Sequence, residues 1–224
     1  MRVLDPSTLP SLIRLIGSDR LAPYLSKQGG DSAQAMRLYS WNVEVSAAIL
    51  GAYAALEVGV RNAMHDRLCY LFGRAEWWAK APLSANDRDQ IREVEEHLDR
   101  RKGPGRWSAG HVVAELKPSF WEGLLANKYH AALWERGLAE AFPHYSGRRS
   151  ALRERMERLR LLRNRAAHHE PIFARDLTVD HRYMCDLAGF VEPELRLWVE
   201  SHSRLPSVVA GRVATVGGER PTRL

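Results

Sequence analysis

The sequence has few cysteines, and disulfide bonds between cysteines are what stabilise many small secreted proteins. Only two of its 224 residues are cysteines, Cys69 and Cys185, and no CxxC pair occurs. This scarcity excludes a disulfide scaffold and is typical of a reducing compartment. The stretch MRVLDPSTLPSLIRLIG carries prolines and an aspartate where a signal peptide would need an unbroken apolar core. We therefore expect a cytoplasmic protein.

Long apolar runs are also missing. The longest uncharged apolar run, AAILGAYAAL at 47–56, is followed at once by Glu57. Spanning a bilayer takes roughly 20 consecutive apolar residues, so the sequence predicts no transmembrane segment and no membrane partner.

Strand signals are nearly absent, whereas helical spacing dominates the chain. No Asn-Gly or Asp-Gly hairpin and no sustained alternation of apolar and polar residues occur before the last twenty or so positions. The pattern predicts an all-α protein with one domain over 1–205 and a flexible tail over 206–224. Helices are expected at 7–16, 19–27, 32–72, 119–142, 146–169 and 179–201. Two further helices are expected after the caps Ser84 and Ser108.

A positive charge excess is the main compositional feature that is present. The net charge is +6 and the pI is near 9.6, chiefly because arginine is abundant. Guanidinium groups bind phosphate in a bidentate manner, so this bias favours a nucleic-acid partner. Many basic proteins bind no particular anion, however, and the charge alone leaves both interpretations open.

The segment RLRLLRNRAAHHEPIF, at 158–173, concentrates this charge near the end of a predicted helix that Pro171 terminates. Leu152, Met156 and Leu159 form an apolar stripe whose next positions, by spacing, are Arg163 and Ala166. Burying an arginine there is costly unless a partner or ligand receives it. Spacing alone is compatible with a structural arginine paired to a carboxylate of another helix, with His168 favouring the helix carboxyl end.

The same residues suit the cleavage of RNA by its own 2′-OH. Such a site needs a proton-transfer group, for which His168 is suited near neutral pH, and a cation for the developing phosphate charge, for which Arg163 is suited. Asn164 lies four positions before His168, on the same helical face. No HExxH motif and no acidic cluster of the two-metal kind occur, so we expect neither a metal nor another cofactor.

The longer string resembles the signature of the HEPN superfamily, with Arg-Asn-x3-His, and specifically that of Abi-like proteins of bacterial phage defence. Three further blocks occur in the order typical of that family, and a Trp-Trp pair lies between the first two. The blocks are RLYSWNVEVSAAILGAYAALEVGVRNAMHDRL at 37–68, AELKPSFWEGLL at 114–125 and ALWERGLAEAFP at 132–143. The resemblance covers roughly residues 19–200, and the chain departs from the family pattern at 117–119.

This resemblance implies a HEPN-type helical bundle with additional helices, and a metal-independent endoribonuclease with a composite active site in a homodimer. The resemblance implies that Arg163 neutralises the scissile phosphate, that His168 transfers the proton and that Asn164 orients the site. Arg165 and His169 are second choices and more suited to RNA backbone contacts. The partners implied are RNA as substrate and a small regulatory or antitoxin RNA. A non-catalytic HEPN protein that only holds RNA is the alternative.

Two further groups each allow two interpretations. Glu57 and Arg61 are spaced as a helical ion pair, with Asn62 beside them and His65 on the same face, and they either form a buried structural pair or hold Arg163 or His168 in place. Large aromatic residues either pack in the core or stack on exposed bases. These are Trp77, Trp78, Phe120, Trp121 and Trp134.

Overall fold

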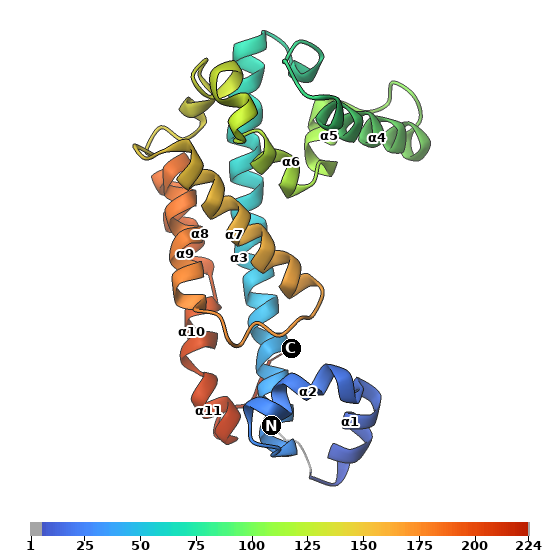
Figure 1. The fold of residues 1–224 in the computed structure, drawn as a ribbon, viewed down its shortest axis with the longest axis vertical. Coiled ribbons are helices and arrows are strands. Elements are labelled where there is room, and N and C mark those ends of the chain that lie inside the picture. Colours follow the sequence, from blue (N-terminus) through green and yellow to red (C-terminus); the bar gives the residue numbers. More distant parts are fainter. Residues whose placement is uncertain (1–5, 224) are drawn as a thin grey trace. The chain divides into compact units, whose positions relative to one another are not determined.

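The computed structural model describes residues 6–223, and this part of the chain contains helices and no strand. The all-α class is therefore confirmed. In order, the elements are η1 (Pro6–Thr8), α1 (Leu9–Ile16), α2 (Ser18–Lys27), α3 (Ser32–Phe72), η2 (Trp77–Ala79), α4 (Ala85–Lys102), α5 (Ala109–Glu115), α6 (Pro118–Gly123), η3 (Asn127–Tyr129), η4 (His130–Trp134), η5 (Leu138–Ala141), α7 (Arg149–Ala167), α8 (Leu177–Val191), α9 (Pro193–His202), α10 (Leu205–Ala210) and α11 (Arg212–Gly217) (Figure 1).

The chain forms two compact units. Of the described residues, the first unit contains 6–54, Leu161–Arg182 and 201–223, and the second contains Ala55–Arg160 and Tyr183–Glu200. The chain passes from one unit to the other within α3, α7, α8 and α9.

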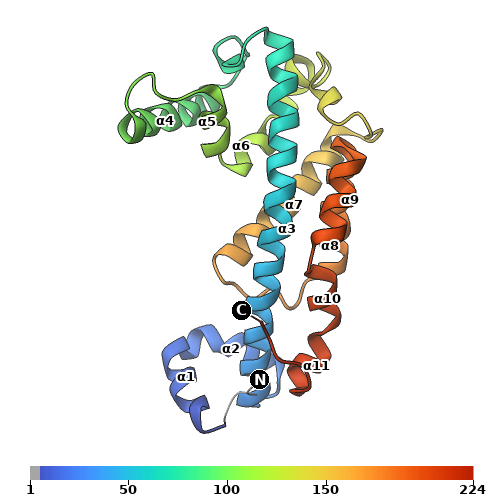
Figure 2. The ribbon, with the colours of Figure 1, turned by 180° about the vertical axis from the view of Figure 1, so that it is seen from behind.

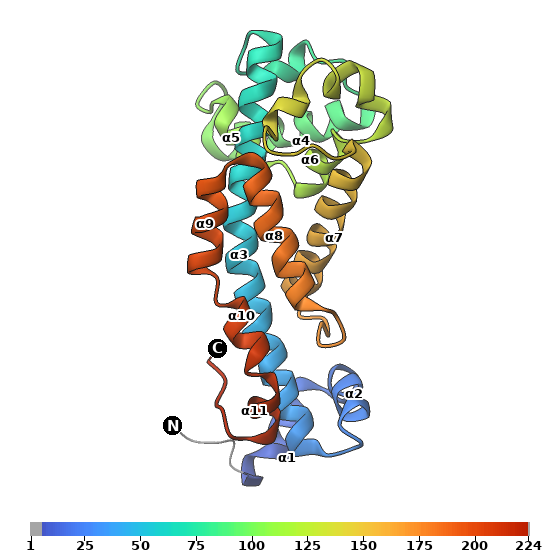
Figure 3. The same cartoon turned by 90° about the vertical axis from the view of Figure 1, so that its left-hand side faces the viewer.

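In the first unit, α10 and α11 run beside the first half of α3 (Figures 2 and 3). The indole Nε1 of Trp41 donates to the carbonyl of Val208 at 2.8 Å, and Nε of Arg37 donates to the carbonyl of Val216 at 2.7 Å. Burial of Leu205 and Val208 fixes α10. The expectation of little fixed structure after Pro206 is therefore wrong for the described residues, because α3 supplies a partner for this segment.

In the second unit, aromatic side chains form the centre of the core. Trp77 lies 6.4 Å from Phe120 and 6.4 Å from Trp121 between ring centroids, and these side chains and Trp78 are buried. The packing interpretation is confirmed for these four residues. Trp134 is half-buried and lies 6.5 Å from Phe142.

Helix boundaries follow the sequence closely where caps and apolar periodicity agree. The long helix ends where it was expected, and Ser84 caps α4 by accepting the Asp87 backbone N–H at 3.4 Å. The predicted continuous helix over 119–142 is wrong, since α6 is followed by three short turns. The predicted helix over 179–201 is also broken, because Pro193 opens a new helix after Glu192.

Candidate functional site

The candidate site lies at the end of α7, in the first unit. His169 adopts a left-handed conformation with φ of 57°, the only non-glycine residue to do so in the described chain. The His169 N–H donates to Ala166 at 3.1 Å, and the Glu170 N–H donates to Arg165 at 2.9 Å. This pair of bonds is the Schellman arrangement, in which glycine is usual. A histidine in its place stores backbone strain, and such strain clusters at functional sites.

Two residues from other helices hold this turn. The amide of Asn42, which is 1% exposed, accepts the Ile172 N–H at 2.9 Å and donates to the Glu170 carbonyl at 3.1 Å. Nη1 of Arg20 donates to the carbonyl of His169 at 2.7 Å. The sequence analysis missed both residues. The only signal for Asn42 was an uncharged polar side chain within an apolar stretch of α3.

Arg163 is half-buried, but it does not take the buried position that the stripe predicted. After Leu159 the buried positions continue through Leu162 and Ala166, all fully buried. The expectation that Arg163 continues the apolar stripe is therefore wrong, because the stripe advances by three residues at this point rather than four. Arg163 lies at its margin instead.

The guanidinium of Arg163 has no carboxylate partner among the described residues. Its Nη1 lies 3.4 Å from Oδ1 of Asn164, the neighbouring side chain, in a long hydrogen bond. Elsewhere on α7, Arg153 and Arg160 both pair with the buried carboxylate of Glu122, at 3.4 Å and 2.7 Å. The ion pair between Arg163 and a carboxylate of another helix, which the structural interpretation requires, is therefore not formed among the described residues.

His168 lies at the last turn with an exposed side chain. Its backbone N–H donates to the carbonyl of Asn164 at 2.9 Å, which continues the helical pattern by one residue. No side chain in the described part of the molecule forms a hydrogen bond or ion pair with its imidazole. Both ring nitrogens are thus open to an external ligand.

Arg165 differs from Arg163, because it is used within the turn itself. Its Nη2 donates to the carbonyl of Pro171 at 2.9 Å. Its Nε lies 3.2 Å from Oε2 of Glu170, close enough for an ion pair although the N–H is not directed at that oxygen. These bonds stabilise the turn and leave Arg165 less free to contact RNA than the sequence predicted.

Glu57, Arg61 and Asn62 belong to the second unit, so their expected support of Arg163 or His168 stays a prediction. The helical ion pair is not formed, since Nη1 of Arg61 donates to the carbonyl of Ala114 at 3.3 Å and Glu57 has no ion pair among residues 6–223. Arg61 is half-buried and its Nε finds no hydrogen-bond partner in the described part of the chain, whereas Asn62 is exposed.

His65 takes part in a separate polar cluster of the second unit. Its Nδ1 accepts the indole N–H of Trp77 at 3.1 Å, so the neutral ring carries its proton on Nε2, which lies 3.5 Å from Sγ of Cys69. Burial lowers the pKa of His65, against a smaller opposite effect of Asp66, and burial raises the pKa of the Cys69 thiol. A protonated Nε2 cannot activate this thiol as a base.

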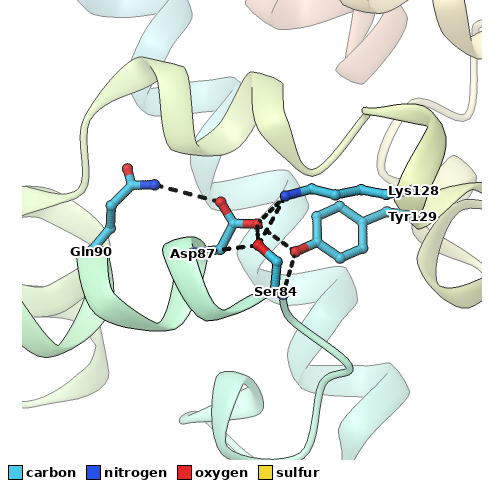
Figure 4. A network of polar contacts seen from close by, with 5 residues as sticks. All are labelled: Ser84, Asp87, Gln90, Lys128 and Tyr129. Carbon is cyan, nitrogen blue, oxygen red and sulfur yellow. Dashed lines mark hydrogen bonds and ion pairs between the residues drawn. The ribbon is translucent and has the colours of Figure 1, made fainter.

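A second polar network of the same unit contains a serine and a lysine in contact (Figure 4). Oδ2 of Asp87 accepts from Ser84 Oγ at 2.6 Å, from Lys128 Nζ at 2.7 Å and from the Tyr129 hydroxyl. Although burial opposes it and is the largest single effect, these donors together lower the pKa of Asp87. The carboxylate likewise raises the pKa of Lys128 despite burial.

A lysine that activates a serine must be neutral. Lys128 is instead held in its charged form and donates to Ser84 Oγ at 2.9 Å. Gln90 completes the network through a long contact of 3.5 Å with Asp87 Oδ1. These residues therefore anchor the start of α4 to η3 and form no nucleophilic site.

Comparisons with protein-family models, with curated proteins and with solved structures found no match to this chain. The family stays an expectation. No three side chains of His, Cys, Asp or Glu gather as metal ligands within residues 6–223. By length and composition alone, α3 is long and apolar enough to cross a membrane, but half of its apolar window is buried in the protein, and core helices pass the same test.

Proposed function

We propose that the chain is a metal-independent endoribonuclease of bacterial phage defence, of the abortive-infection or toxin–antitoxin type, acting in the cytoplasm. One observation carries the proposal. Arg163 is half-buried without a carboxylate partner among the described residues, and it shares a helix end with Asn164 and the exposed His168. A guanidinium held without a counter-ion favours an anionic ligand, and phosphate fits its geometry.

The reaction needs no nucleophile from the protein. The 2′-oxygen of the substrate attacks the adjacent phosphorus, the bond from phosphorus to the 5′-oxygen breaks, and a 2′,3′-cyclic phosphate forms. The 2′-hydroxyl loses a proton and the leaving 5′-oxygen gains one; His168 transfers one of these protons and solvent water transfers the other. Arg163 stabilises the extra charge on the phosphate oxygens, and Asn164 holds the guanidinium.

The separation of the two main residues favours a composite site. Five positions along an ideal helix place Arg163 and His168 about 140° apart. Two copies of the α7 end that face one another would bring Arg163 of one copy to His168 of the other. A homodimer is therefore part of the proposal.

The test is incubation of the purified protein with total RNA in EDTA. We expect products with 2′,3′-cyclic phosphate ends, lost in Arg163→Ala and in His168→Ala. Arg182→Ala is the matched control, because it removes one exposed arginine from the same unit. A strict metal requirement, or equal activity in all three variants, would contradict the proposed chemistry.

One observation favours a second candidate function, a HEPN protein that binds a structured or small regulatory RNA without cutting it. No described side chain orients the imidazole of His168, whereas catalytic histidines commonly have an orienting partner. RNA retained in a filter-binding assay without cleavage products, weakened in Arg163→Ala and unchanged in His168→Ala, would support this function.

A further inference from the structure

A second group of arginines in the first unit surrounds a cavity of about 320 Å³. The cavity lies where the chain after α11 returns to α3 and α10, on residues that the proposed function does not use. Its volume is at the lower end of the range for small-ligand sites. Its lining consists of Glu44, Arg204, Ser207, Val208, Arg220, Pro221 and Arg223.

Glu44 and Arg220 form the rigid part of this cavity. Nη1 and Nη2 of Arg220 donate to the two carboxylate oxygens of Glu44, at 3.0 Å and 2.8 Å, in a bidentate pair. Nη1 also donates to the hydroxyl of Thr215 at 2.9 Å. Because Glu44 is only 1% exposed, this pair is a fixed element rather than a loose surface contact.

The other two guanidinium groups are not neutralised. Arg204 and Arg223 are exposed, and neither forms an ion pair with a carboxylate of the described residues. Among the described residues, three positive charges and one negative charge therefore line the cavity, leaving an excess of two positive charges. Gathering like charges without a counter-ion destabilises a fold, and an anion in the cavity removes that cost.

The lining chemistry selects among anions. Val208 and Pro221 give an apolar wall, and the Ser207 hydroxyl donates its proton to the Arg204 carbonyl at 2.8 Å, so the guanidinium groups are the donors that face an anion. We propose that this cavity binds a phosphate group, either of a small phosphate ester or of a nucleic-acid end. Phosphate offers several acceptor oxygens and a charge that matches the excess.

The test is a calorimetric titration of the full-length protein with inorganic phosphate. The same titration with chloride at equal ionic strength is the comparison. The double variant Arg204→Gln/Arg223→Gln keeps the Glu44–Arg220 pair. We expect it to lose affinity by about tenfold or more for each guanidinium removed. Ser207→Glu, which places a carboxylate in the lining, is expected to abolish binding without touching an arginine.

Arg14→Gln/Arg182→Gln is the matched control, because it removes the same charge from exposed positions of the same unit. It should bind phosphate as the unmodified protein does. Absence of saturable phosphate binding, or equal weakening in the two double variants, would overturn the proposal. Circular dichroism of each variant separates lost binding from lost folding.

A further comparison identifies the source of the phosphate. A 2′-O-methylated oligoribonucleotide, which cannot be cut through its 2′-oxygen, is titrated with and without a 5′-phosphate. Tighter binding of the phosphorylated form, lost in Arg204→Gln/Arg223→Gln, assigns the cavity to nucleic-acid ends. Equal binding of the two forms, with inorganic phosphate still bound, assigns it to small phosphate esters. Both results measure binding only, so they do not depend on whether the proposed site at Arg163 and His168 cleaves RNA.

Discussion

Replacing Asn42 by alanine tests whether the candidate site depends on a clamp from α3. The substitution removes the acceptor of the Ile172 N–H and the donor to the Glu170 carbonyl. Ile172 is fully buried, so its N–H loses a partner without gaining water, whereas Glu170 is exposed and its carbonyl can be hydrated. An unsatisfied buried donor and a lost hydrogen bond together predict a loss of about 2–4 kcal/mol of unfolding free energy.

Urea unfolding followed by circular dichroism measures this loss as a lower midpoint at an unchanged slope. Asn62→Ala is the matched stability control, since it removes an exposed asparagine from the same helix and should change the free energy by less than about 0.5 kcal/mol. At temperatures where the variant is still folded, Asn42→Ala should also lower the cleavage rate about ten- to a hundredfold. The turn that carries His168 is then no longer held in place. A stability equal to that of Asn62→Ala would refute the clamp.

Three other changes have expected outcomes. Replacing His169 by glycine should raise the unfolding free energy by about 0.5–1 kcal/mol in thermal melts, because glycine adopts the left-handed conformation without strain. Glu122→Gln should lower it by about 1–3 kcal/mol in urea, because Arg160 loses its buried carboxylate at 2.7 Å. The pKa of His65 is lowered in the folded state, so its contribution to stability is present above the ordinary value of about 6.5 and lost as the pH falls through the folded value. A protonated His65 cannot accept from Trp77, and His65→Gln should flatten this pH dependence in unfolding measured from pH 5 to 8.

The sequence was most informative where local signals suffice. The long helix α3 could be predicted to its last residue, because a Gly-Gly-Asp break precedes it and its apolar pattern is continuous up to Phe72. Ser84 was equally recognisable as a helix cap. Arg163, Asn164 and His168 were selected from their short spacing together with the resemblance of the segment 158–173, because the spacing alone is also compatible with a structural arginine.

The rest depended on contacts between distant positions. Asn42 lies 130 positions from Ile172, whose backbone N–H it accepts. No local pattern in either segment predicts this contact. The segment after Pro206 is held by contacts with α3. Trp41 donates to the carbonyl of Val208, 167 positions away, and Glu44 accepts from Arg220, 176 positions away. Without those partners the composition there is typical of a flexible tail.

Local ambiguity explains the remaining errors. The aromatic segment after Lys117 has helical spacing, but α6 ends at Gly123 and the short elements η3, η4 and η5 follow it. Arg163 and Leu162 are neighbours, so a single change of step from four to three decides which one is buried. Periodicity cannot fix that step where two helix faces are both partly apolar.

The central claim is that RNA is cut by its own 2′-oxygen with Arg163 and His168 as the protein groups. The most direct measurement is cleavage in EDTA of an RNA that carries a single 2′-deoxynucleotide immediately before a mapped cleavage position. We predict that cleavage at this phosphate is lost while unmodified positions in the same molecule are still cut. Cleavage that persists at the 2′-deoxy position would contradict the claim.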